Sequence, residues 1–311
     1  MALKLDNEIV HTTATEVIMQ NSESFTNGTN GAILVSSKSI MGDLEATSML
    51  GEIANIIGGR DINATTNATV KNLVSRDENN IKLFWGTGAI EFGLTEATRY
   101  GADANAFSVA VGEQIGKGIV NYLLNGAIAG LVGSISSQPT LITGDGTAKI
   151  THSLLNQGLK PMGDARGSVV AWVMNGATYA DLLDGALAVT TYNVAGGAIN
   201  DGAVGTLGLP TFVSDSPALA MATGVAVLGV TSSAINAIES ASRNFVSEII
   251  SGGENLKYRI QAEGEFALDV KGYSWSAGTT NPSQVALATS TNWTMKASDV
   301  KSTAGVLINV A

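Results

Sequence analysis

The chain contains no cysteine among its 311 residues and only two histidines, His11 and His152. The lack of cysteine excludes disulfide bonds, thiol nucleophiles and cysteine-ligated zinc. The histidines are far apart in the sequence, and a metal site would need both of them to converge with carboxylates. No motif of a hydrolase, of a phosphate-binding loop or of a dinucleotide-binding fold is present. We therefore expect no catalytic residue, no cofactor and no metal.

Charge is also scarce, since 14% of the residues are charged and 45% are hydrophobic, with a net charge of −10. The surface of a small solvated domain normally carries about 25 to 35% charged residues. Much of this chain's surface is therefore expected to be buried against copies of itself. Basic residues form no cluster, which argues against sequence-specific nucleic-acid binding. The first residues lack the apolar run of a secretory signal, so we expect synthesis and use in a cytoplasm.

The most prominent positive feature is a long, almost uncharged helix predicted over 103–137. Apolar residues recur there every four positions, Asp103 is a suitable N-cap, and Pro139 follows the end. Such a helix would be roughly 50 Å long. Its six glycines each cost roughly 1 kcal/mol relative to alanine, which predicts close backbone approach by other elements. The part from Ile119 to Ile135 is apolar, but Asn121, Asn125 and its short length argue against a membrane span.

The segments before this helix are predicted to include an extended arm and a hairpin. Residues 1–38 have scattered apolar positions and read as an arm, with a short strand at Ile33–Val35. Residues 39–58 have the pattern of an amphipathic helix. Alternation in 69–74 and 81–85 brackets a polar tip, Ser75–Asn80, which indicates a hairpin. This hairpin has few core residues, so we expect it to lie on a neighbouring subunit or on the long helix.

The segments after Pro139 predict an α/β lobe over 141–235. Helices are expected at 151–159 and 179–187, and strands at 168–174, 209–213 and 224–230. A further short helix is expected at 241–250. Residues 256–274 alternate with period two, which predicts an antiparallel strand pair or a long ribbon.

The order of these elements, together with several local strings, resembles the tailed-phage major capsid proteins of the Hong Kong 97-type fold. The strings are FSVAVGEQIGKG at 107–118, THSLLNQG at 151–158 with Gly163-Asp164, VVAWVMN at 169–175 leading into YADLL at 179–183, LGLPTFVSD at 207–215, and YRIQAE at 258–263 leading to VKGYSW at 270–275. The resemblance covers nearly the whole chain.

The resemblance implies an α+β fold with five parts. These are an N-terminal arm (1–40), a short helix with an extended loop hairpin (41–100), the spine helix of a peripheral domain (101–140), an axial α/β domain (141–235), and a return to the peripheral sheet with C-terminal strands (236–311). Intersubunit contacts are then expected from the loop, at Lys71, Leu73, Lys82, Phe84 and Trp85. A Trp85→Asp change should block assembly and leave the subunit soluble.

The implied function is structural. Subunits would form hexamers and pentamers that build an icosahedral virion head around viral double-stranded DNA, assembled in the host cytoplasm. The implied partners are other copies of the chain, a portal, a possible decoration protein and DNA contacted non-specifically, with no membrane. The charged helical segment that some relatives carry before the arm is absent, so scaffolding would be a separate protein or the segment has been removed. Some relatives form Lys–Asn crosslinks, but no motif selects an Asn or a catalytic Glu for Lys71 or Lys82.

Three other interpretations remain at the level of the sequence. An encapsulin-like nanocompartment shell would have a similar fold and package an enzyme. A secreted surface-layer or adhesin protein would suit the Gly-, Thr- and Asn-rich composition, although no signal sequence is present. An enzyme would require a nucleophile, a base and an orienting group, and no such set is found.

Overall fold

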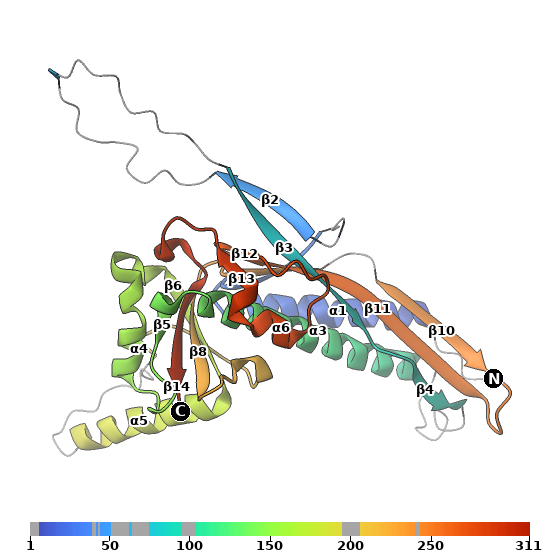
Figure 1. The fold of residues 1–311 in the computed structure, drawn as a ribbon. Helices are drawn as coiled ribbons and strands as arrows, with labels where there is room; N and C mark the ends of the chain where they lie inside the picture. The colour runs from blue at the N-terminus through green and yellow to red at the C-terminus, as the bar shows by residue number, and fades with distance from the viewer. Residues whose placement is uncertain are drawn as a thin grey trace.

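The computed structural model describes residues 6–38, 42, 44–50, 62–63, 75–94, 104–194, 206–239 and 243–311. It has an elongated part, in which two helices lie along a twisted sheet, and a lobe around a second sheet (Figure 1). A ribbon of two strands, β2 (Leu44–Leu50) and β3 (Ser75–Gly86), rises from the junction of the two parts (Figure 1). The C-terminus lies in the lobe.

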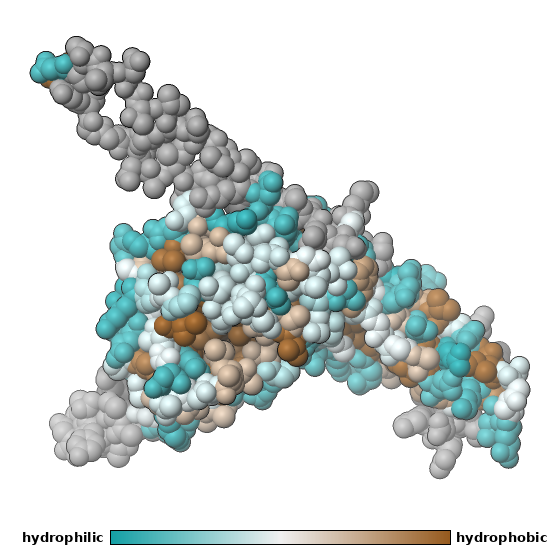
Figure 2. All heavy atoms as spheres, viewed as in Figure 1, coloured by the Kyte–Doolittle hydropathy of each residue, from teal (hydrophilic) through white to brown (hydrophobic). Residues whose placement is uncertain are grey.

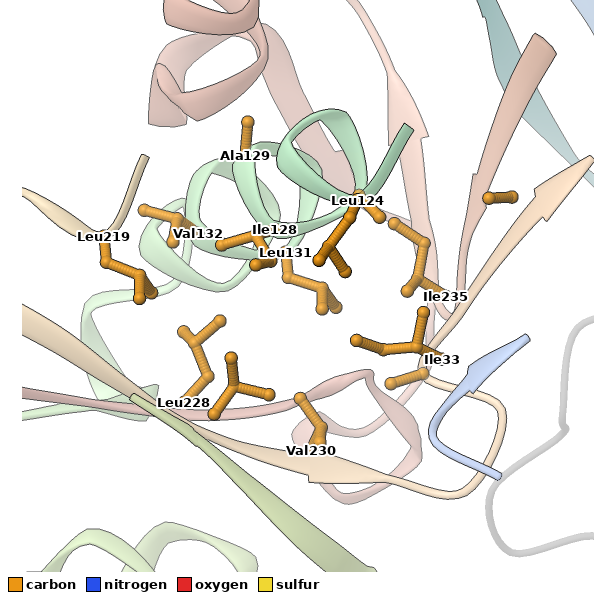
Figure 3. Close-up of a cluster of buried hydrophobic side chains, with 14 of the residues drawn as sticks. Ile33, Leu124, Ile128, Ala129, Leu131, Val132, Leu219, Leu228, Val230 and Ile235 are labelled. Carbon is orange, nitrogen blue, oxygen red and sulfur yellow. The ribbon is translucent and has the colours of Figure 1, made fainter. Parts of the chain in front are cut away.

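The predicted long helix is present as α3 (Ala104–Ser136), 33 residues that correspond to roughly 50 Å. The expected N-cap, Asp103, lies outside the described residues. Among the described residues α3 is the one helix long and apolar enough to cross a membrane, but 78% of its apolar window is buried inside the protein. Figure 3 shows Leu124, Ile128 and Leu131 of α3 pointing into the same cluster as Leu228 and Ile235. The helix is therefore the core element that joins the two parts.

The glycines of α3 allow other elements to approach its backbone, as the sequence predicted. A Cβ added at Gly112 would lie 2.8 Å from the carbonyl oxygen of Val10, and one at Gly116 would lie 3.0 Å from that of Ala14. A Cβ at Gly133 would overlap the carbonyl oxygen of Leu287. Close approach does not explain every glycine of α3, because no atom lies within 4 Å of a Cβ added at Gly118.

The N-terminal segment is a helix, α1 (Asn7–Gly28), which corrects the prediction of an extended arm. The Asp6 side chain caps the helix by accepting a hydrogen bond from the backbone N–H of Glu8 (2.9 Å). Val10, Ala14 and Ile18 recur at helical spacing and are buried. The apolar stripe is narrow and lies among Thr, Asn and Ser residues, so the sequence alone does not reveal the helical spacing of these residues.

The large sheet has the order β1-β9-β11-β3-β2, and β10 and β4 also pair with β11. The predicted strand at 33–35 is β1 (Ile33–Ser37), which lies parallel to β9 (Ile235–Glu239). The segment predicted to be a helix at 241–250 is instead strand β10 (Asn244–Ile250), antiparallel to β11 (Lys257–Val270). Exposed and half-buried residues alternate along β10 because only one of its faces packs on the protein.

The predicted hairpin is also corrected, because β3 continues without a turn through the proposed tip at 75–80. Its N-terminal half pairs with β2, from Leu44 opposite Ile81 to Leu50 opposite Ser75. Part of the helix predicted at 39–58 is therefore a strand. The other predicted arm of the hairpin, residues 69–74, lies outside the described residues.

The lobe is built on a five-stranded sheet with the order β5-β14-β8-β6-β7, in agreement with the predicted strands at 168–174, 209–213 and 224–230. The predicted helices at 151–159 and 179–187 are also confirmed, as α4 and α5. The C-terminal strand lies between β5 and β8, so the end of the chain completes this sheet. The bounds are β5 (Ile142–Thr143), α4 (His152–Gly158), β6 (Val169–Met174), α5 (Gly176–Val194), β7 (Thr211–Val213), β8 (Val225–Thr231) and β14 (Gly305–Val310).

Two short strands, one short helix and several 3-10 turns lie outside the two main sheets. Strand β12 follows β11 and pairs with β13, and α6 packs beside the C-terminal half of α3. Their bounds are β12 (Tyr273–Trp275), α6 (Gln284–Ala288) and β13 (Trp293–Met295), with 3-10 turns η1 (Pro139–Leu141), η2 (Lys160–Ser168), η3 (Pro217–Leu219), η4 (Ser290–Asn292) and η5 (Val300–Ser302), and the bounds of β4 in the large sheet are Ile90–Gly93.

Candidate subunit-contact surfaces

The predicted contact residues on β3 lie on opposite faces of the strand. Trp85 faces the core with 8% of its surface exposed, and a Cβ added at Gly264 would lie 2.5 Å from its ring. Phe84 points the other way and is 44% exposed. Trp85 thus stabilises its own subunit, and we now expect Trp85→Asp to damage the fold and not to leave a soluble subunit. Lys71 and Leu73 lie outside the described residues.

Lys82 is buried and paired within the subunit. Its ammonium lies 2.6 Å from the carboxylate of Glu265 on β11 and 5.4 Å from the centre of the Phe84 ring. Both charges are largely removed from water, with side-chain exposures of 9% and 19%. Of the predicted contact residues on β3, Phe84 is therefore the one that stays accessible, with 44% of its surface exposed.

A groove of about 620 Å³ runs between Phe84 and α3. Phe84, Thr87 and Ile90 line one wall, and Gln114 and Tyr122 belong to the other wall. None of the groove's lining residues is charged, so the groove offers an apolar and hydrogen-bonding surface. Such a surface suits contact with another protein segment better than contact with an ion.

A row of charged side chains holds the strands at the elongated end together. Arg259 on β11 lies 2.5 Å from Glu91 on β4 and 3.4 Å from Glu248 on β10, and Lys257 lies 3.3 Å from Glu91. Hydrogen bonds from Arg259 and then Lys257 lower the pKa of Glu91. Exposed pairs of this kind contribute little stability, so their main effect is to fix the register of the three strands. These pairs could not be predicted from local patterns, because Glu91 and Arg259 are 168 residues apart in the sequence.

Exposed apolar side chains gather at the same end. Figure 2 shows hydrophobic patches there between hydrophilic ones. Ile90 is 40% exposed, and Ile249 and Leu256 are each 52% exposed. A cluster of this kind marks a protein-interaction surface.

A buried carboxylate lies where the β2–β3 ribbon leaves the sheet. Burial is the largest cause that raises the pKa of Glu78, Asp269 adds to it, and Lys296 opposes it. A pKa raised by folding means that ionised Glu78 costs stability at high pH, and this cost disappears as the pH falls through the raised pKa. Protonation of Glu78 therefore removes the cost of burying its charge at the base of the ribbon.

We expect Glu78→Gln to raise the free energy of unfolding at neutral pH. The gain should shrink as the pH falls through the raised pKa of Glu78, because the native carboxyl becomes neutral there. Urea unfolding at several pH values measures it, with Glu254→Gln in an exposed loop as the control. A gain that is independent of pH, or equal in the control, would show that burial of the Glu78 charge is not its origin.

No group of three or more His, Asp or Glu side chains within the described ranges could hold a metal ion. The described surfaces include an uncharged groove, exposed apolar side chains at the elongated end and a projecting ribbon. They define a protein that associates through extended surfaces, and a fold in which a long helix joins a peripheral sheet to a lobe.

Comparisons with known proteins place this fold among phage capsid subunits. A solved structure of Mycobacterium phage Cain aligns over 91% of this chain and 89% of its own, with 15% identity and a TM-score of 0.56. The satellite phage P4 procapsid that includes a size determination protein aligns over 96% and 91%, with 10% identity and a TM-score of 0.52. The cyanophage Pam1 capsid asymmetric unit aligns over 76% and 84%, with 10% identity and a TM-score of 0.52. A search of the curated proteins finds no match.

The family model described as major capsid protein 13-like (Gp13-like) matches residues 2–307. The chain belongs to this family. It is a structural major capsid protein with the Hong Kong 97-type fold, and it is located in the virion capsid. The resemblance seen in the sequence is thereby confirmed, and the family match favours a phage capsid over the encapsulin-like, surface-layer and enzyme interpretations.

Proposed function

We propose that the chain assembles as hexamers and pentamers into an icosahedral head that encloses viral double-stranded DNA. The observation that carries this proposal is the match of residues 2–307 to a major capsid protein family. The low content of charged residues and the exposed apolar cluster at the elongated end also support it. In this role the subunit works through its interfaces and performs no catalysis.

The domain organisation follows from the two sheets. In the proposal, the large sheet with α1 and α3 forms the peripheral domain, and the lobe of residues 141–231 with β14 forms the axial domain. Residues 41–100 hold the extended loop, and its base is the β2–β3 ribbon. In the same proposal the axial domain ends at 235, where β9 (Ile235–Glu239) enters the large sheet.

Several partners belong to the proposal. Assembly in the host cytoplasm would require a separate scaffolding protein and a portal, with a decoration protein as a further candidate. The procapsid of satellite phage P4 includes a size determination protein, which supports an external partner that sets shell size. Packaged DNA would be contacted without sequence specificity, and no membrane is involved.

Phe84 provides a direct test of the contact surface. We expect Phe84→Asp to leave a folded subunit but to reduce shell formation about tenfold or more, because an exposed aromatic anchor at an interface is typically worth about 2 kcal/mol. Sedimentation separates shells from free subunits, and circular dichroism reports the fold. Val285→Asp is the matched control, since Val285 is 79% exposed on α6 and does not line the groove. Equal loss in both variants would contradict a specific role for Phe84.

A further inference from the structure

The outer edge of β10 is an unpaired strand edge. Within the described residues β10 pairs only with β11, in an unbroken register from Asn244 opposite Glu263 to Ile250 opposite Lys257. Natural proteins usually protect such edges with lysine, proline or a bulge. The sequence NFVSEII has none of these and carries one charge, Glu248. An edge of this kind requires a partner to be protected from uncontrolled association.

The hydrogen-bonding groups that point outward can be identified from the neighbouring strands. The backbone N–H groups of Thr87 and Leu94 donate to the carbonyls of Ala262 and Leu256, so even-numbered residues of β11 face β3 and β4. Odd-numbered residues of β11 therefore face β10, and their partners there are Asn244, Val246, Glu248 and Ile250. The backbone groups of Phe245, Ser247 and Ile249 are left pointing outward.

We propose that β10 pairs with β10 of a second copy, antiparallel about a two-fold axis at Ser247. This inference rests on the proposed function, because a shell subunit meets other copies of itself. Every outward residue then faces another outward residue: Phe245 faces Ile249 of the second copy, and Ser247 faces its own counterpart. The pairing joins the two large sheets into one continuous sheet.

Other registers fit less well. An axis between two residues would place outward groups opposite groups already bonded to β11. An axis at Val246 or Glu248 would leave one outward residue of each copy beyond the end of the strand. It would also separate Phe245 from Ile249, and these are the apolar residues that the Ser247 axis brings together.

This pairing would place Ile249 of one copy beside a groove on the other copy. Phe245 and His11 meet edge to face, with 5.1 Å between ring centres, and both line a groove of about 590 Å³ beside α1. Ile249, which is 52% exposed in the single subunit, would enter the groove of the second copy. Glu248 stays paired with Arg259 of its own subunit, so no unpaired like charges meet across the axis.

Single cysteines test the pairing in assembled shells, because the chain has no cysteine of its own. In a bonded antiparallel pair the Ser247 Cα atoms would be about 5.5 Å apart, within the range that a disulfide spans. Asn244→Cys is the control. Residue 244 would face residue 250 of the second copy, so the two residues 244 would be six positions apart along the strands, or roughly 20 Å. After oxidation with diamide we expect at least about tenfold more covalent dimer from Ser247→Cys than from Asn244→Cys.

The outcomes separate this inference from the proposed function. Shells that form normally but yield no Ser247→Cys dimer, or equal dimer from both variants, would overturn the two-fold pairing and leave the capsid role intact. Failure of the unmodified protein to form shells would contradict the proposed function itself. A second pair of variants covers the case in which Ser247→Cys does not assemble. Ile249→Asp should then reduce shell formation strongly, whereas Val285→Asp, at an exposed position on α6 outside the groove and the strand edge, should not; equal effects would overturn the pairing.

Discussion

Replacing Gly133 with alanine is expected to destabilise the subunit more than any other single methyl addition in α3. The added Cβ would overlap the carbonyl oxygen of Leu287 and lie 2.8 Å from the indole nitrogen of Trp293. That nitrogen donates a hydrogen bond to the same carbonyl (2.7 Å), so neither group can move without loss of the bond. We expect a loss of about 3 kcal/mol or more, the upper end for overpacked cores.

Gly118 supplies the matched control on the same helix. It is exposed, and no atom lies within 4 Å of an added Cβ. Gly118→Ala should therefore raise stability by up to about 1 kcal/mol through helix propensity. Urea unfolding followed by circular dichroism compares both variants with the unmodified protein. If Gly133→Ala unfolded at the same urea concentration as the unmodified protein, the close packing of α6 on α3 would be wrong.

The second large effect is expected from Arg243→Met, because it leaves a buried carboxylate without its partner. Arg243 lies 2.7 Å from Glu239, with side-chain exposures of 11% and 5%, and it also donates to the hydroxyl of Thr15 on α1 (2.9 Å). Removal of one member of a buried pair typically costs about 3 to 5 kcal/mol. The change should therefore unfold the region where α1 meets the large sheet.

Two further variants identify the origin of that loss. Arg243→Met combined with Glu239→Gln should recover much of the stability, because the uncompensated charge is gone. Lys149→Met breaks the exposed pair with Asp181 (2.8 Å) and should leave the free energy of unfolding nearly unchanged. A double variant as unstable as Arg243→Met alone would attribute the loss to packing and not to charge.

Much of the fold could be predicted from local periodicity. The apolar repeat of α3, the buried run of β6 and the strands β7 and β8 are each determined by a pattern within one element. The failures at α1, β2 and β10 have physical causes. Helix α1 and strand β10 are only partly buried, so their apolar patterns are weak, and β2 is a strand because it pairs with β3, which lies beyond the segment between them in the sequence.

The contact surfaces were harder to predict. The sequence draws attention to Lys82, Phe84 and Trp85, but it cannot tell which of these side chains face the core. The structure buries Trp85 over Gly264 and pairs Lys82 with Glu265, so Phe84 is the residue that stays on the surface. The edge of β10 could not be predicted, because the pattern of residues 241–250 favours a helix.

Electron microscopy of the purified protein under assembly conditions tests the central claim most directly. The account predicts closed icosahedral shells, in which the subunit fits both six-fold and five-fold positions and the elongated parts meet between capsomers. A monomer of 31.8 kDa that persists under those conditions would contradict it.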